Sequence, residues 1–274
     1  MTLKVRNQIF RIFFYFSIAS VIISTASFIF LTLNKNIIAL PAFRIPQILN
    51  KIPFATENQN ATFISFFILG LYVPLVLFFI FRYFENTQSS EIIFFSAFLL
   101  SILCEVARFY TLCFGIWETF TNLLIFLGNI VLFGRILAPL SFVCASILSE
   151  REQQQDIERN YTLMIVTAFV FALIIPLNTA KISSAGQVFE SFSFPLSEIK
   201  FLLIILAAVS FYIRSFKHKN RDYIPLALWT FLLYIGYLIL ISADNYLFMI
   251  LGTLILFPGT FFYLKDLHKM YMWL

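Results

Sequence analysis

Residues 92–114 read IIFFSAFLLSILCEVARFYTLCF, and the stretch is apolar along almost its whole length, with Glu105 and Arg108 as its only charges. It is long enough to cross the hydrocarbon core of a bilayer, which takes about 20 residues of helix. Its apolar residues run continuously and do not alternate with polar ones, as they would in a barrel strand. Because backbone groups in lipid must be satisfied internally, we expect a membrane-spanning helix.

The same kind of run recurs along the chain. We predict eight spans, at residues 12–33, 62–81, 92–114, 121–148, 161–180, 199–213, 224–242 and 246–264. The basic residues before the first run are also typical of a signal peptide, but the run is longer than the usual apolar core of about 7 to 15 residues, so we interpret it as a retained span. The prediction is an all-α integral membrane protein, a single domain over residues 1–274 with no soluble domain.

The overall composition agrees with this fold class. Of the 274 residues, 61% are hydrophobic and only 12% are charged, with 37 phenylalanines, whereas a soluble domain carries about 25% charged residues. The net charge of +5 is explained by contact with anionic lipid headgroups, so it gives no reason to invoke nucleic acid. We therefore expect the lipid bilayer as the main partner.

The positions of Lys and Arg predict the orientation, because these residues are retained on the cytoplasmic side. With the N-terminus inside, twelve fall in inner segments and five in outer segments, while Arg108 and Arg135 lie within spans. The inner set is Lys4, Arg6, Arg11, Arg82, Arg151, Arg159, Arg214, Lys217, Lys219, Arg221, Lys265 and Lys269. The outer set is Lys35, Arg44, Lys51, Lys181 and Lys200. Both termini are therefore predicted to be cytoplasmic, in a multi-pass protein of the cell inner membrane.

The sequence offers no catalytic or metal-binding signature. It has no G-x-S-x-G elbow, no H-E-x-x-H, no Walker loop and no G-x-G-x-x-G. Its three cysteines fall within spans without C-x-x-C spacing, and its two histidines lack nearby ligands in a metal-site pattern. We expect no catalytic residue, no metal and no cofactor.

The strongest candidates for functional residues are three charged side chains inside the third and fourth predicted spans. Glu105 and Arg108 are three residues apart, so they share a helix face. Glu105 lies 13 residues after Ile92 and Arg135 lies 13 residues before Leu148, which places both roughly 20 Å from the cytoplasmic ends of their spans. The segment between these spans is short, so the spans are expected to be antiparallel neighbours. The two charges could therefore meet.

An isolated charge at that depth costs at least about 2.5 to 3.5 kcal/mol, so each needs a partner or a polar cavity. The functional interpretation is a polar pocket or solute path formed by these three residues, with Asn129, Glu118 and Asn122 toward its outer mouth. The structural interpretation is a buried ion pair that fixes the packing of two helices. A third interpretation, for Arg108 alone, is that its side chain extends to the outer headgroups.

Other segments give weaker expectations. Pro176 lies near the outer end of the fifth span and predicts a kink there. The stretch 265–274 mixes lysines with Tyr and Trp and is expected at the membrane surface. The polar stretch 149–160 is interpreted as a solvated helical end that could contact a cytoplasmic partner.

Three classes of function fit these features. The first is a non-enzymatic sensing or binding module, or an accessory membrane subunit, with a protein partner in the membrane or the cytoplasm left open. The second is a small-solute transporter that uses the charges as a midplane site. The third is an intramembrane lipid-modifying enzyme, with Glu105 as general acid or base and the arginines on an anionic headgroup.

Overall fold

A computed structural model gives the arrangement of the chain. It describes residues 3–33, 56, 58–85, 87, 89–116, 121–148, 156–183, 185–217 and 222–272. Within these residues the protein is helical apart from one small hairpin, and eight helices are long and apolar enough to cross a membrane. The fold class predicted from the apolar runs is thereby confirmed at this level.

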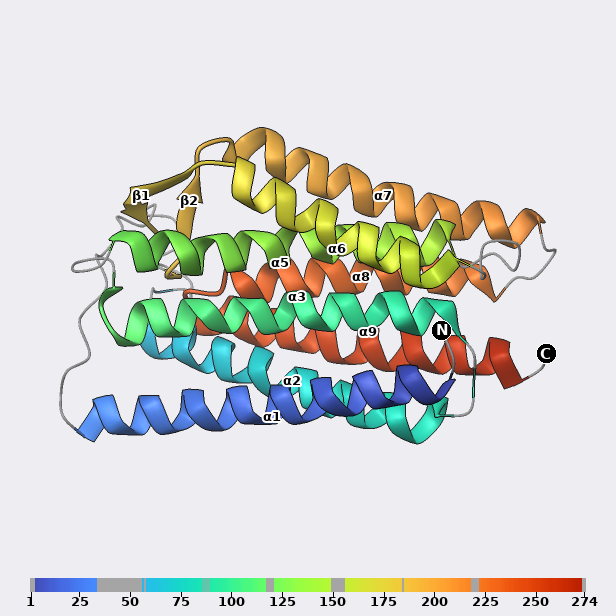
Figure 1. Ribbon diagram of the computed structural model, residues 1–274, viewed down its shortest axis with the longest axis horizontal. Helices are drawn as coiled ribbons and strands as arrows, with labels where there is room; N and C mark the ends of the chain where they lie inside the picture. Colours follow the sequence, from blue (N-terminus) through green and yellow to red (C-terminus); the bar gives the residue numbers. More distant parts are fainter. Residues whose placement is uncertain are drawn as a thin grey trace.

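The helices follow one another in antiparallel order (Figure 1). They are α1 (Leu3–Leu33), α2 (Gln59–Phe84), α3 (Ser90–Cys113), α5 (Thr121–Ile147), α6 (Ile157–Ile174), α7 (Ser193–Lys217), α8 (Tyr223–Ile241) and α9 (Tyr246–Met272). Strands β1 (Leu177–Ile182) and β2 (Val188–Glu190) form an antiparallel hairpin between α6 and α7.

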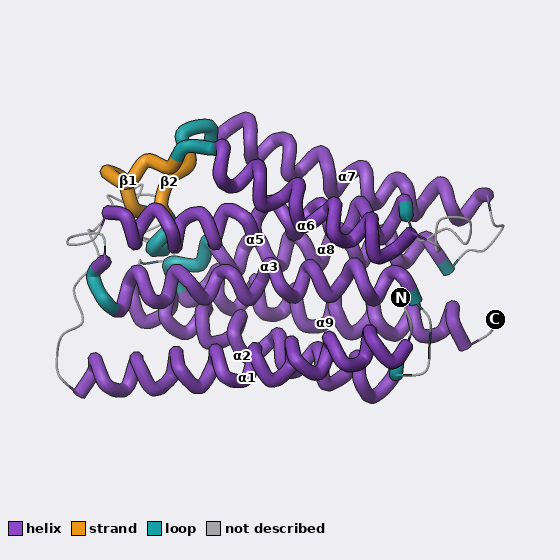
Figure 2. The backbone as a smooth tube through the Cα atoms, in the orientation of Figure 1, coloured by secondary structure: helices purple, strands orange, loops and turns teal. Residues whose placement is uncertain are grey.

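Both chain termini lie at one end of the bundle and the hairpin lies at the other (Figures 1 and 2). We call these the terminal end and the hairpin end. An even number of antiparallel helices produces this arrangement, in which α3 and α5 run in opposite directions side by side.

The fifth helix is shorter than the sequence predicted. It ends at Ile174, and Ile175 has an extended backbone (φ −74°, ψ 117°), because the ring of a following proline disfavours the helical conformation. The predicted kink at Pro176 is therefore wrong. The apolar run continues into β1, and hydropathy alone does not distinguish a short apolar strand from the end of a helix.

The last helix is longer than predicted. Residues 265–272, which we expected at the membrane surface, continue α9 as helix. Two contacts with α8 and the residue before it hold this extension: Trp229 donates to Asp266 at 2.8 Å, and Lys269 donates to Asp222 at 2.9 Å. Most of the polar stretch 149–160, interpreted as a solvated helical end, lies outside the described residues, which resume at Asp156.

The buried core is centred on α3, which has the largest buried share of the eight spans. Figure 1 shows it between α1 and α2 on one side and α5 on the other. The peripheral helices α1, α6 and α7 instead expose large apolar side chains, such as Phe16, Phe169 and Leu202. In a membrane these faces suit contact with acyl chains, which is why a bundle with so little polar surface can be stable.

Helices α3 and α5 approach closely at Gly134. A Cβ atom at this position would lie 2.7 Å from the backbone oxygen of Ser101 and 2.8 Å from Cβ of Cys104. Lipid gives helices no hydrophobic drive to associate, so small residues that allow close van der Waals packing become decisive. This contact also fixes the position of the next residue, Arg135, against α3.

Candidate functional site

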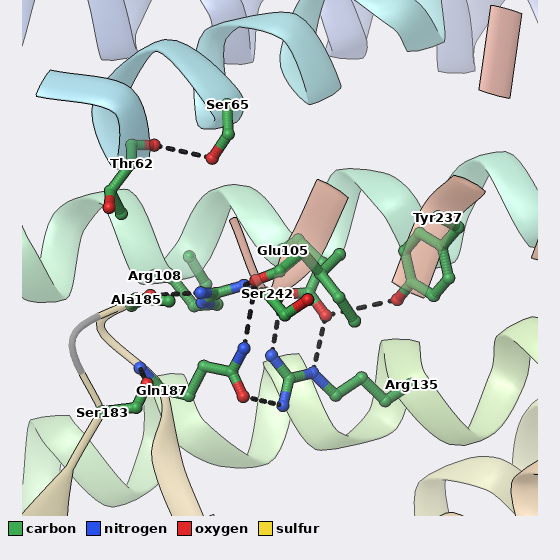
Figure 3. A network of polar contacts seen from close by, with 12 residues as sticks. Thr62, Ser65, Glu105, Arg108, Arg135, Ser183, Ala185, Gln187, Tyr237 and Ser242 are labelled. Carbon is green, nitrogen blue, oxygen red and sulfur yellow. Dashed lines mark hydrogen bonds and ion pairs between the residues drawn. The ribbon is translucent and has the colours of Figure 1, made fainter. Parts of the chain in front are cut away.

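The structure brings three of the six predicted site residues together. Arg135 of α5 donates from Nε to Oε1 of Glu105 on α3 at 2.8 Å, and Arg108 donates from Nη1 to Oε2 at 2.9 Å (Figure 3). All three are buried, with Glu105 fully enclosed. They meet nearer the hairpin end of α3 than the terminal end.

The Glu105 carboxylate is saturated with hydrogen bonds. Besides the two contacts above, Arg135 Nη2 donates to Oε2 at 3.3 Å and the Tyr237 hydroxyl of α8 donates to Oε1 at 3.2 Å. An ionised carboxylate has about four acceptor positions, and all four are used. The described part of the chain therefore engages every acceptor position of this carboxylate.

Arg108 ties α3 to two backbone segments that end near it. It donates from Nη1 to the carbonyl of Ile241, the last residue of α8, at 2.8 Å, and from Nη2 to the carbonyl of Ala185 in the hairpin loop. Its guanidinium also lies over the ring of Phe66, 4.9 Å from the centroid. The side chain is 2% exposed, so the interpretation in which Arg108 extends to the headgroups is wrong.

The loop between β1 and β2 reaches into the bundle and completes the cluster. Gln187 accepts from Arg135 Nη1 at 3.0 Å and donates to the carbonyl of Ile241 at 3.0 Å. Ser183 fixes the loop by accepting at Oγ from the backbone N–H of Gln187 at 3.1 Å. Gly186 adopts φ +67°, a conformation that favours glycine. We call Glu105, Arg108, Arg135, Gln187 and Tyr237 the hairpin-end cluster.

A small cavity adjoins the two arginines. Its volume is about 10 Å³, which is room for roughly one water molecule. The residues around it come from α3, α5 and the hairpin, and include Arg108, Thr111, Gly128, Arg135, Gly186 and Glu190. Glu190 pairs with Lys200 of α7 at 3.6 Å, and both side chains are largely buried.

Two of the other three predicted residues do not join the cluster. Asn129 and Asn122 precede Arg135 by 6 and 13 residues, so at about 100° per residue they point roughly 120° and 140° away from it around the helix. Asn122 is exposed and Asn129 half-buried. Glu118 lies outside the described residues.

A second buried cluster occupies the terminal end. Glu91 of α3 accepts from the hydroxyl of Tyr271 on α9 and from Ser89 and Ser90, and Arg214 of α7 lies 3.8 Å from its carboxylate. We call these five residues the terminal-end cluster. Arg214 also donates to the carbonyl of Ile147 at the end of α5, at 3.2 Å.

Several of these residues, among them Glu91, Gln187 and Tyr237, are not among the site residues predicted from the sequence. Glu91 precedes Glu105 by 14 residues, a spacing that places both on nearly one face of α3, about 21 Å apart. That regular spacing is a signal that could have identified the second cluster. Gln187 and Tyr237 carried no comparable signal, because one lies in a loop and the other in an ordinary apolar run.

The contacts of both clusters are hydrogen bonds and ion pairs between protein groups. No group of three or more His, Cys, Asp or Glu side chains within the described ranges is placed to hold a metal ion. Comparisons with protein-family models, with curated proteins and with solved structures find no match to this chain. The functional argument therefore depends on the geometry of the two clusters.

Proposed function

We propose that the chain is a multi-pass protein of the cell inner membrane with both termini in the cytoplasm, and that it acts as a non-enzymatic sensing module. The bias of Lys and Arg toward the terminal end supports this orientation. The hairpin-end cluster then faces the outer side and the terminal-end cluster the cytoplasm.

The observation that carries the proposal is the position of α7. This helix begins three residues after β2 ends, so it is directly continuous with the hairpin that Arg108 and Arg135 hold. Arg214, 21 residues after Ser193, belongs to the terminal-end cluster, about 32 Å away along the helix. One helix therefore joins both clusters.

The packing of α7 is suited to small movements. Its buried side chains form a narrow stripe that includes Ile204, Ala207 and Phe211, and most of its other side chains are exposed or half-buried. Shifts of about 1 to 2 Å are typical for helices that transmit signals by sliding. A change in the hairpin loop would shift α7 and alter the contact between Arg214 and Glu91.

The alternative functions find less support in the same geometry. A transporter needs space for its solute, and the cavity beside the arginines holds about one water. A lipid-modifying enzyme needs a free acid or base, and the acceptor positions of Glu105 are all engaged. A sensing module that responds to a bound ligand requires neither a solute-sized space nor a free acid or base.

The test is a distance measurement between spin labels at Phe216 and Lys265, two exposed positions at the terminal end. The native cysteines are replaced by alanine, and the protein is placed in lipid nanodiscs. The variant Gln187→Ala removes the two hydrogen bonds of the Gln187 side chain, to Arg135 and to the carbonyl of Ile241. It should shift or broaden the distance distribution by about 1 to 2 Å. Phe189→Leu, on the exposed face of β2, is the matched control and should leave it unchanged.

Hydrogen exchange of residues 183–187 shows in parallel whether the loop has been released. A released loop with an unchanged label distance would mean that α7 transmits nothing, and the sensing proposal would fail.

A further inference from the structure

The charges of the hairpin-end cluster do not balance. Glu105 contributes one negative charge, and Arg108 and Arg135 contribute two positive charges in nearly complete burial. The neighbouring pair of Glu190 and Lys200 adds no net charge. Arg108 donates to the carbonyl of Ile241 at the C-terminal end of α8, and the helix dipole places about half a negative charge at that end. Among the residues that the structure describes, a net positive charge therefore remains in this buried position, and burying a charge without compensation is costly.

The same two arginines retain unused donors. Each guanidinium carries five N–H groups, and each uses three of them in hydrogen bonds within the described part of the chain. Nε of Arg108 is buried and has no hydrogen-bond partner among these residues. Such donors are normally satisfied, so an acceptor is expected beside them.

The cavity lies where that acceptor would sit. Arg108 and Arg135 both line it, and so does Thr111, whose hydroxyl makes only a long hydrogen bond of 3.5 Å to the carbonyl of Ala107 and can exchange it for a closer acceptor. Its volume of about 10 Å³ gives room for roughly one water-sized sphere, so a monoatomic ion matches it in size more closely than a tetrahedral oxyanion does. A water molecule fits but leaves the charge uncompensated.

We propose that this cavity binds a monoatomic anion of halide size, with chloride as the probe. The inference rests on the proposed function in taking the same cluster as the binding site, and it names the class of ligand. The anion accepts hydrogen bonds from Arg108, Arg135 and Thr111, and these charge-assisted contacts strengthen the attachment of the hairpin loop. Glu190 also borders the cavity, and its pairing with Lys200 offsets its repulsion of the anion.

The test measures thermal unfolding of the full chain in nanodiscs of neutral lipid, in sodium chloride and in sodium gluconate at equal ionic strength. Binding to the folded state should raise the melting temperature in chloride, by about 4 to 5 °C for each tenfold increase above half-saturation. Bromide should act like chloride.

Two threonine variants locate the effect. Thr111→Val removes a donor from the cavity without changing its shape and should raise the half-saturating chloride concentration several-fold. Thr230→Val is the matched control, because Thr230 is equally buried and also donates to a carbonyl of its own helix, that of Leu226, but does not line the cavity. Its chloride response should equal that of the original protein.

Three results would overturn the inference. The first is an equal melting temperature in chloride and gluconate over the whole range. The second is a response to sulfate or phosphate that matches the response to chloride, which would contradict the size assignment. The third is a chloride response that Thr111→Val leaves unchanged. The spin-label shift in Gln187→Ala requires no halide, so this failure is distinguishable from failure of the sensing proposal.

Discussion

Replacing Arg135 with methionine removes one of the two arginines that neutralise Glu105. The carboxylate loses the contacts at 2.8 and 3.3 Å, and Gln187 loses its donor at 3.0 Å. Breaking a buried ion pair costs about 3 to 5 kcal/mol, because the remaining charge is uncompensated. Glu105 keeps Arg108 and Tyr237 as donors, so we expect a loss near 3 kcal/mol, or roughly 10 °C in melting temperature.

Glu105→Leu should cost more than Arg135→Met, at about 5 kcal/mol, because it leaves two buried guanidinium groups without their shared anion. Combining these two substitutions does not restore an apolar core, since Arg108 would remain buried beside carbonyl groups alone. Only the triple replacement that also includes Arg108→Met removes all three charges, and it should recover much of the stability.

The assay is reversible unfolding by titration with a denaturing detergent, followed by circular dichroism. Arg159→Met is the matched control, because Arg159 pairs with Asp156 at the same distance of 2.8 Å but both side chains are largely exposed, and exposed pairs contribute about 0 to 1 kcal/mol. If Arg135→Met costs no more than this control, or costs more than Glu105→Leu, the account of the cluster is refuted.

Three further predictions concern packing, capping and topology. Gly134→Ala places a Cβ against backbone and should cost about 1 to 3 kcal/mol in the same unfolding assay. Gly70→Ala is the control and should be tolerated, because its Cβ would meet its nearest atom at 3.5 Å. Equal effects of the two substitutions would contradict the close approach of α3 and α5. Arg6→Leu should cost about 2 kcal/mol because Arg6 donates to the terminal carbonyls of α2, at 2.7 Å for Phe84, whereas Arg11→Leu removes only an exposed contact at 3.9 Å and should have little effect. With both termini cytoplasmic, a C-terminal fluorescent-protein fusion should fluoresce and Gln59→Cys should react with an impermeant thiol reagent from outside; an active C-terminal phosphatase fusion would contradict this orientation.

The eight long apolar helices could be predicted from the sequence because lipid imposes one strong requirement on a chain that enters it. Every backbone group inside the bilayer must be paired within its own segment, so a continuous apolar run such as 92–114 has few alternatives to a helix. Helical geometry also predicted that Glu105 and Arg135 lie at the same depth along their helices. The rise per residue is fixed in a helix, and helices joined by a short segment are antiparallel neighbours. The prediction failed at Pro176, where an apolar strand follows directly on an apolar helix.

The composition of the cluster was decided by tertiary structure alone. Gln187 reaches Arg135 only because the hairpin loop folds back into the bundle with Gly186 at positive φ, and Tyr237 reaches Glu105 only because α8 packs beside α3. These contacts join residues more than 50 positions apart, and hydropathy reports only whether a segment enters the membrane. Which faces meet depends on side-chain volume and close approach, as at Gly134, and those are properties of the packed bundle.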